Sequence, residues 1–316
     1  MTRRLLCVGV AASLDRYLWL PRYEFGNVNR PSRVLELAGG KAFNVARAAT
    51  GLQVATHVVA QVGGHTGEAL RTLVQRDGIC AELVVGSSNT RQCTCLLDEA
   101  THRVTEVYEP VPPRTAQDDA RMDAAFTRAL HQLTLGDFLV ISGRLPSGGD
   151  PRLFANWVRL GKQYGLTVIV DSEGEALANA LQECPDIVKV NVDEAATALA
   201  PHASHEPTAL ATRLAQLTGG LAIVTAGAEG ACAATSSEVG ALCPPEIENG
   251  APAGSGDSFI AGIVAVLQEP GTRLADLPKV LQAGTAASRV NVRHFIAGDV
   301  TMDAWLEERD HLRLTR

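Results

Sequence analysis

The sequence has few of the features that would tie a protein to a membrane or a nucleic acid. It contains no apolar stretch long enough to cross a bilayer, and its first apolar run, residues 5–12, soon meets the charged pair Asp15-Arg16. We therefore interpret this run as a buried strand rather than as part of a signal peptide. Lysine and arginine form no block and the formal net charge is −7. This balance argues against a nucleic acid or a membrane as the main partner.

Several common motifs are also missing. The sequence has no Walker A motif and no G-x-G-x-x-G after a strand, which excludes the usual P-loop and dinucleotide-binding classes. Its seven cysteines form no C-x-x-C pair, and we expect buried, reduced thiols in a cytoplasmic protein. No internal repeat or low-complexity linker divides the 316 residues. One large domain or two modest domains fit this length.

Short apolar runs alternate with helical patterns along most of the chain, which predicts an α/β fold with a parallel sheet. The expected strands include residues 5–12, 56–62, 138–142, 166–170 and 221–225, and one that starts at Ile187. Open α/β sheets bind ligands at the carboxyl ends of their strands. Polar residues that follow these runs are therefore the first candidates for a site.

The most informative stretch is a glycine-rich turn that runs directly into a helical apolar pattern. Gly254, Ser255 and Gly256 leave the backbone uncrowded, and Asp257 follows at once. The free N–H groups and the positive dipole end at the start of a helix make an anion site. Asp257 is then either an N-cap, a position that Asp favours, or a general base beside a bound phosphate.

A second glycine turn precedes another helical pattern. Gly39 and Gly40 permit close approach of a ligand to the backbone, Lys41 offers a cation, and Asn44 offers an amide one helical turn later. Asp15 follows the first strand, where it would bind a ligand or cap a turn. The plain alternative for Lys41 is a solvated side chain beside a structural turn.

A third group of polar residues lies at the carboxyl end of the strand that starts at Ile187. Lys189, Asn191 and Glu194 bring together a cation, an amide and a carboxylate. This set suits ATP phosphates and, through water, Mg²⁺, which prefers oxygen ligands. Asn191 and Glu194 also have the spacing of a helix capping box, and both interpretations can hold together.

These motifs, in this order, resemble those of the PfkB (ribokinase-like) carbohydrate kinases. The stretch Gly254-Ser-Gly-Asp257 is similar to the GAGD signature of the family, and the K-x-N-x-x-E pattern at 189–194 matches another of its motifs. The GGK-x-x-NVARA stretch from Gly39 is similar to the N-terminal signature of the 1-phosphofructokinase and tagatose-6-phosphate kinase branch. The resemblance runs from about Cys7 to Ser288, which is most of the chain.

The resemblance implies roles on the acceptor side. Asp257 would take the proton from a sugar hydroxyl, while the backbone of Gly254, Ser255 and Gly256 holds the phosphoryl group in transfer. The residues implied to line the sugar site are Asp15, Gly39, Gly40, Lys41 and Asn44. Arg91, in a Thr-Arg pair that the branch shares, would hold the phosphate already on the sugar, because its planar fork suits two phosphate oxygens. Arg144 is a candidate for a second phosphate contact or a solvated residue.

On the other side, the resemblance implies ATP and Mg²⁺ as cofactors. Glu194 would reach the metal through water. The residues implied to bind the nucleotide are Lys189, Asn191, Glu194, Thr225, Gly227, Gly230, Gly284 and Ser288. The small residues at 283–288 would admit the adenine, or else they are helix-packing residues.

The sequence departs from the family pattern at several places, including Ser172 and Glu173 in a stretch, 171–177, that is otherwise similar to D-T-S-G-E-A-L of the branch. Ser255 stands where the family usually has alanine, and Ala42 replaces a usual glycine. Ala11-Ala12 stands where the branch commonly has Asn-Pro, and Arg144 where most relatives have a small residue. The last three departures lie at the substrate end, so they bear on which sugar is used rather than on phosphoryl transfer.

The fold implied by the resemblance is ribokinase-like α/β, with a central, mostly parallel sheet flanked by helices on both faces and a small β-sheet lid. Residues 1–12, 38–87 and 111–316 would form the nucleotide- and substrate-binding core, and residues 13–37 and 88–110 the lid. An exposed lid sheet needs its apolar face covered, so we expect a homodimer formed lid to lid. The apolar residues we expect on that face are Tyr17, Trp19, Val107 and Tyr108.

Together these features predict an ATP-dependent phosphotransferase that phosphorylates a hydroxyl of a ketohexose phosphate, such as fructose 1-phosphate, fructose 6-phosphate or tagatose 6-phosphate. The first alternative is a kinase of an unphosphorylated sugar or nucleoside, for which Arg91 and Arg144 are dispensable. The second is a catalytically silent sugar- or nucleotide-binding regulator. The intact Asp257 and K-x-N-x-x-E set argue against this second alternative.

Overall fold

The computed structural model describes residues 3–199 and 205–312, and its central element is a nine-stranded sheet. In spatial order the strands are β13 (Val239–Leu242), β12 (Ala231–Ala234), β11 (Leu221–Thr225), β10 (Ile187–Asn191), β9 (Thr167–Asp171), β8 (Phe138–Ser142), β1 (Leu5–Gly9), β4 (Thr56–Val62) and β5 (Ala81–Val85). The seven strands from β11 to β5 are parallel, while β12 and β13 add antiparallel at one edge. The carboxyl ends of the parallel strands therefore meet at one edge of the molecule.

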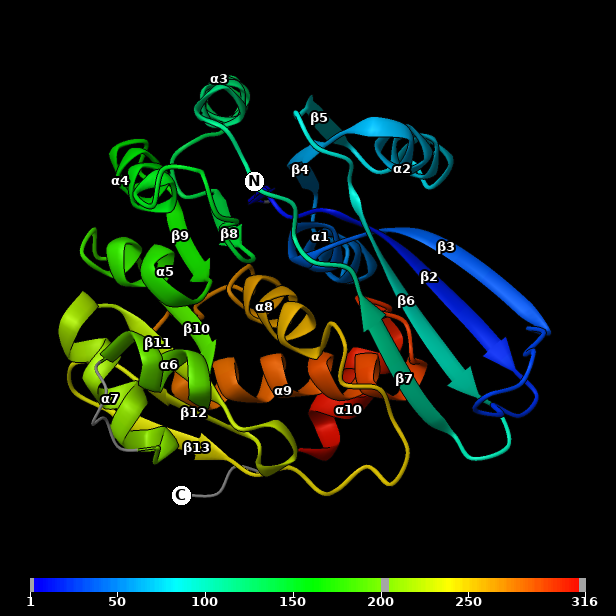
Figure 1. Cartoon of the computed structure of the whole chain (residues 1–316). Helices are drawn as coiled ribbons and strands as arrows, with labels where there is room; N and C mark the ends of the chain where they lie inside the picture. The colour runs from blue at the N-terminus through cyan, green and yellow to red at the C-terminus, as the bar shows by residue number, and fades with distance from the viewer. Residues whose placement is uncertain (1–2, 200–204, 313–316) are drawn as a thin grey trace.

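Helices cover both faces of this sheet (Figure 1). On one face lie α1 (Lys41–Gly51), α2 (Gly64–Arg76), α8 (Ser255–Val266), α9 (Leu277–His294) and α10 (Met302–His311). On the other lie α3 (Ala116–Leu130), α4 (Leu153–Gln163), α5 (Gly174–Leu181), α6 (Val192–Leu199) and α7 (Pro207–Thr218). Alternate residues of β1 enter the two cores, Leu5 and Cys7 on one side and Leu6 and Val8 on the other. This two-sided burial explains why its sequence is a continuous apolar run.

A second, four-stranded sheet extends away from the core on the right of Figure 1. It consists of β3 (Arg33–Gly39), β2 (Ser13–Leu20), β6 (Arg91–Asp98) and β7 (Arg103–Tyr108), in that order. A mostly parallel sheet with helices on both faces and a separate small sheet confirm the predicted fold class. None of the described helices has both the length and the apolar character needed to span a membrane.

The register of the second sheet separates the apolar residues that we expected on one face. Asp15 lies beside Cys93, and Cys93 beside Tyr108, so odd-numbered β2 residues share a face with Tyr108. Tyr17 and Trp19 are on this inner face, and the Tyr17 hydroxyl accepts a hydrogen bond from the Ala297 amide at 3.1 Å. Of the expected set, only Val107 lies on the opposite, outer face, because side chains alternate along a strand.

The cysteines divide into two groups. All seven are free thiols. Buried ones are Cys7, Cys93, Cys95 and Cys232, and exposed ones are Cys80, Cys184 and Cys243. The expectation of buried thiols therefore holds for four of them.

Candidate active site

Asp257 lies in the first turn of α8, but it is not the N-cap. The cap position belongs to Gly254, which has a φ of +74° and makes no side-chain cap bond. A Cβ on Gly254 would lie 2.6 Å from the Ala297 Cβ, so both the backbone angle and the available space require glycine there. The Asp257 carboxylate instead accepts a hydrogen bond from Asn44 Nδ2 at 2.9 Å. The capping interpretation of Asp257 is therefore wrong, and the carboxylate is left available for chemistry.

The surroundings of Asp257 raise its pKa to about 6. Burial is the main cause, since the residue is only 5% exposed, and the negative charge of Asp171 adds to it. The charges of Lys41 and Lys189 and the hydrogen bond from Asn44 act in the opposite direction. A carboxyl group with this pKa is ionised at neutral pH and holds a proton more readily than an ordinary aspartate.

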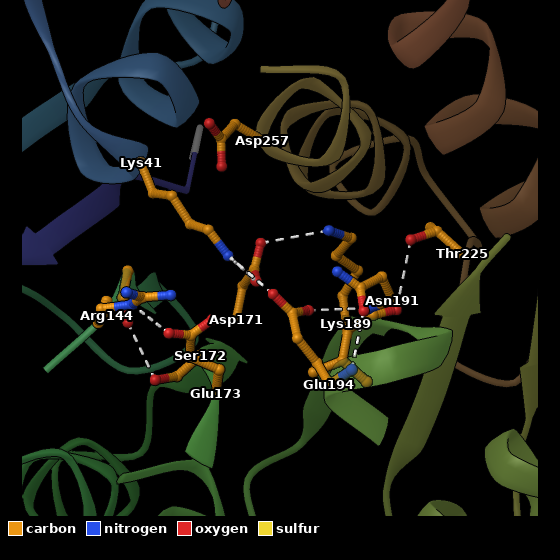
Figure 2. Close-up of polar contacts among 12 residues, drawn as sticks. Lys41, Arg144, Asp171, Ser172, Glu173, Lys189, Asn191, Glu194, Thr225 and Asp257 are labelled. Atoms are coloured by element: carbon orange, nitrogen blue, oxygen red, sulfur yellow. Dashed lines mark hydrogen bonds and ion pairs between the residues drawn. The ribbon is translucent and has the colours of Figure 1, made fainter. Parts of the chain in front are cut away.

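Two lysines and a buried aspartate lie beside Asp257 (Figure 2). Asp171, at the end of β9, has no exposed surface and pairs with Lys41 Nζ at 2.7 Å and Lys189 Nζ at 3.3 Å. Burial works to raise the pKa of Asp171, but the two ammonium groups outweigh it and hold that pKa below its usual value. A Cβ on Gly256 would lie 2.4 Å from Lys189 Nζ, so this ammonium lies against the N-terminal turn of α8. The Lys189 charge and the N-terminus of α8 thus converge where an anion would bind.

Asn191 and Glu194 form the predicted capping box at the start of α6. The backbone amide of Asn191 donates to Glu194 Oε2 at 2.9 Å, and the backbone amide of Glu194 donates to Asn191 Oδ1 at 2.8 Å. The other carboxylate oxygen, Glu194 Oε1, lies 3.6 Å from Lys41 Nζ. Lys41 therefore points toward the K-x-N-x-x-E residues as well as beginning the helix that follows Gly39-Gly40.

The donors present fit a magnesium ion only in company with a nucleotide. The described residues contain no group of three or more His, Cys, Asp or Glu side chains placed to hold a metal. Glu194 and Asp171 offer carboxylate oxygens at the carboxyl ends of neighbouring strands. Mg²⁺ keeps several waters and is usually bound by one or two carboxylates together with substrate phosphates. The carboxylates of Glu194 and Asp171 match this pattern, with nucleotide phosphates and water as the remaining ligands.

A hollow of about 250 Å³ leads to the N-terminus of α8. Its lining includes six of the predicted nucleotide-binding or anion-binding residues, namely Thr225, Gly227, Gly230, Ser255, Gly256 and Ser288. Gly284 is not part of the lining, because it packs beneath the Phe259 ring, which a Cβ would meet at 2.3 Å. For Gly284 the helix-packing alternative describes the observed position.

The predicted sugar-binding residues lie where the second sheet joins the core. The Asp15 carboxylate is buried, accepts a hydrogen bond from Ser13 Oγ at 2.6 Å, and would lie about 2.0 Å from a Cβ on Gly39. Gly40 has a φ of +92° and approaches the Ala11 carbonyl, so glycine is required at both turn positions. Burial raises the pKa of Asp15 to about 6, opposed by the Ser13 hydrogen bond and the charges of Arg47 and Arg91.

The two predicted phosphate-binding arginines are differently placed. Arg91 is on the inner face of the second sheet beside Ser13, and its Nη1 lies 3.5 Å from the Glu109 carbonyl oxygen. Its Nε is buried and has no hydrogen-bond partner among the described residues. Arg144 is exposed and forms an ion pair with Glu173 at the rim of an open hollow between β8 and α5. Figure 2 shows this pair apart from Asp257.

Two residues of the site, Asp171 and Arg47, were assigned no role from the sequence. Asp171 directly follows an expected strand, and this position is the signal that would have identified it. Arg47 lies in the NVARA stretch and donates through Nη1 to the Ala297 carbonyl at 2.7 Å and through Nη2 to the Ala38 carbonyl. It therefore connects the Gly39 turn with the segment that packs against Gly254.

Comparison with known proteins agrees with this geometry. The model of the pfkB family carbohydrate kinases matches residues 2–303. The chain is 27% identical over 310 residues to a tagatose-6-phosphate kinase of Staphylococcus epidermidis, covering 96% of each chain. It is 30% identical over 299 residues to a 1-phosphofructokinase of Rhodobacter capsulatus, covering 91% of this chain and 90% of that protein. Its fold is similar to that of phosphofructokinase-2 from Escherichia coli in complex with fructose-6-phosphate, with a TM-score of 0.83, 24% identity and 99% of each chain covered. The chain belongs to the pfkB family of carbohydrate kinases.

Proposed function

We propose that this carbohydrate kinase transfers the terminal phosphoryl group of ATP to a hydroxyl of a ketohexose phosphate, with Asp257 as the general base. The observation that carries the proposal is the position of Asp257. It is buried in the first turn of α8, at the end of the hollow lined by Ser255 and Gly256. Asn44, from the helix that follows the Gly39-Gly40 turn, donates a hydrogen bond to it. Fructose and tagatose phosphates are the acceptors to test first, because relatives named 1-phosphofructokinase and tagatose-6-phosphate kinase cover most of the chain.

In this mechanism the acceptor hydroxyl lies against Asp257 and gives up its proton as its oxygen forms a bond to the phosphorus of the terminal phosphoryl group. The bond from that phosphorus to the bridging oxygen breaks, and ADP leaves with the electron pair. Phosphoryl transfer needs positioning and charge stabilisation more than covalent chemistry. The backbone amide of Gly256 and the ammonium of Lys189 would stabilise the charge on the transferring group, whereas the Ser255 amide already donates to the Pro252 carbonyl oxygen at 3.0 Å.

Magnesium fits this site through Glu194, with water between, and it would supply charge neutralisation on the nucleotide phosphates. Thr225, Gly227, Gly230 and Ser288 would position the nucleotide in the hollow that they line. Asp15, Gly39, Gly40 and Asn44 would orient the sugar hydroxyls, and Arg91 would bind the phosphate that the acceptor already carries. The buried, unpartnered Nε of Arg91 supports this last role.

The test is Asp257→Asn, assayed by ADP release with Mg-ATP and fructose 6-phosphate, fructose 1-phosphate or tagatose 6-phosphate. We expect turnover to fall by about 10²- to 10⁴-fold, the usual contribution of a general base, while the variant still binds ATP. Near-normal turnover would overturn the assignment. Asp193→Asn is the matched control, since Asp193 is an exposed acidic residue of α6.

A kinase of an unphosphorylated sugar or nucleoside is the second candidate, because one predicted phosphate ligand is already neutralised. Arg144 forms an ion pair with Glu173. Fructose, ribose and adenosine therefore belong in the same acceptor panel. Turnover on one of these alone, unaffected by Arg91→Gln, would favour the second candidate and keep Asp257 as the base.

We also propose a homodimer formed through the outer face of the second sheet. Val34 and Val107 are 49% and 57% exposed there, and Leu18 and Leu96 of the two middle strands share that face. Such a surface is a candidate for association. Light scattering on the purified protein should give twice the chain mass, and Val107→Lys should shift it to the monomer mass; a monomeric wild-type protein would overturn this proposal.

The seven free thiols support placing the protein in the reducing environment of the cytoplasm. Fractionation of cells that express it should recover it with cytoplasmic markers. Recovery from an oxidising compartment would contradict this placement.

A further inference from the structure

Lys41 has an unexpected set of partners for a residue assigned to the sugar. Its Nζ lies 2.7 Å from Asp171 Oδ1 and 3.6 Å from Glu194 Oε1 (Figure 2). The backbone of Lys41 belongs to the acceptor side, directly after Gly40, whereas its ammonium reaches the carboxylate proposed to serve the metal. One side chain therefore connects the two halves of the site.

Both carboxylate oxygens of Glu194 have a partner within the chain. Oε2 accepts the hydrogen bond of the Asn191 amide and Oε1 faces the Lys41 ammonium. Because the capping bond closes the first turn of α6, we expect it to persist when a ligand binds. The oxygen that a magnesium-bound water would approach is thus the one that faces Lys41.

We propose that Lys41 competes with magnesium for Glu194: its ammonium neutralises this carboxylate until the metal enters with the nucleotide and displaces it. This inference rests on the proposed nucleotide and metal site. Two cations on one carboxylate oxygen repel each other, and the Lys41 side chain is only 32% exposed, so solvent screens that repulsion incompletely.

The displaced ammonium retains its shorter contact with Asp171. From there it faces the space beside Asp257, whose pKa its charge helps to lower. Metal entry would therefore move a cation from the nucleotide carboxylate toward the acceptor. This exchange gives the structure a way to couple metal-nucleotide binding to preparation of the acceptor site.

The experiment isolates the part of nucleotide affinity that depends on the metal. AMP-PNP, an ATP analogue that resists transfer, is titrated into wild type and Lys41→Met by calorimetry, once with excess Mg²⁺ and once with EDTA. The ratio of the two dissociation constants measures how much the metal increases the affinity for the nucleotide, which we call the gain from the metal. It is independent of any contact that Lys41 makes with the phosphates in both conditions.

If Lys41 is a competitor, the gain from the metal increases in Lys41→Met, by roughly fivefold for an ion pair of ordinary strength. Lys41→Gln should behave in the same way and provides a second variant if the first folds poorly. An unchanged or smaller gain in a variant that binds AMP-PNP would overturn the competition alone. Wild-type protein that binds no AMP-PNP would overturn the proposed nucleotide site, and the competition with it.

Two matched lysine variants complete the design. Lys189→Met removes a charge from the same cluster, but Lys189 pairs with Asp171 rather than with Glu194. Lys162→Met removes a positive charge from α4, where Lys162 forms an ion pair with Asp186. Neither should increase the gain from the metal. An equal increase in Lys189→Met would trace the effect to the net charge of the cluster and would overturn a specific competition at Glu194.

Discussion

The pKa of Asp257 makes a quantitative prediction about the pH dependence of the enzyme. A base with a pKa of about 6 is active when deprotonated, so turnover should fall as the pH drops through that value. One pH unit below the pKa, about a tenth of the base is ionised, so the protonation of Asp257 alone should lower kcat/KM at pH 5 to roughly a tenth of its value at pH 7. Asp15, whose pKa is also about 6, adds to this fall through its proposed contact with the acceptor. An ordinary aspartate, with a pKa near 4, would show almost no loss over this interval.

Asp171→Asn tests the origin of that pKa. The negative charge of Asp171 helps to raise the pKa of Asp257, after burial. Its removal also frees the Lys41 and Lys189 ammonium groups, whose charges lower that pKa. Both effects lower the pKa of Asp257, so the fall of kcat/KM on the acid side of the pH profile (its acid limb) should move to lower pH by roughly one unit.

The assay is ADP release with the best acceptor, recorded as kcat/KM from pH 4.5 to 8 at constant ionic strength. Asp193→Asn removes an exposed carboxylate near the cluster and should leave the limb in place. A wild-type profile that is flat down to pH 5, or an acid limb that moves upward in Asp171→Asn, would refute the reasoning. A lower rate with an unmoved limb would leave Asp171 a purely structural role.

Three further predictions follow from particular contacts. Gly256→Ala places a Cβ 2.4 Å from Lys189 Nζ, so the lysine must move, and we expect the KM for ATP to rise in steady-state assays while the melting temperature stays within a few degrees. Arg91→Gln should raise the KM for a phosphorylated acceptor by 10-fold or more, since a charge-assisted contact contributes about 1.5–3 kcal/mol, and leave the KM for ATP unchanged; equal effects on both would contradict its assignment. Asp119→Ala breaks a buried pair with Arg114, whose Nε and Nη2 both donate to Asp119 Oδ1, and should lower the free energy of unfolding in urea by about 3–5 kcal/mol.

The sequence was sufficient where function depends on backbone geometry. A Cβ would collide with neighbouring groups at three glycines, Gly39, Gly40 and Gly254. Glycine-rich turns before helices can be recognised directly in the sequence. The capping box of Asn191 and Glu194 was predictable for the same reason, since its three-residue spacing closes within one helical turn. In such motifs the partners are neighbours in the chain.

The sequence was insufficient where a long side chain chooses among partners that are distant in the chain. Lys41 can rotate its four-carbon stem, and only the assembled sheet shows that Asp171 and Glu194 lie within its reach. The face occupied by Tyr17 required the pairing register of β2 with β6, and Gly284 required the position of Phe259. Each of these depends on contacts between elements, which no local pattern encodes.

The charges of the assembled site explain why Asp257, rather than a neighbouring carboxylate, suits the proposed role of general base. The cluster contains the ammonium groups of Lys41 and Lys189 and the carboxylates of Asp171, Glu194 and Asp257. Both ammonium groups pair directly with Asp171, and Lys41 also faces Glu194, whereas the direct partner of Asp257 is the neutral amide of Asn44. Burial without a paired cation raises the pKa of Asp257, while the two lysines lower that of Asp171. When the pKa values of neighbouring carboxylates differ in this way, the one with the lower pKa remains a fixed negative charge and the one with the higher pKa can accept a proton. The same ion pairs that hold the lysines in place therefore leave Asp257 as the carboxylate that can both lose and accept a proton near neutral pH.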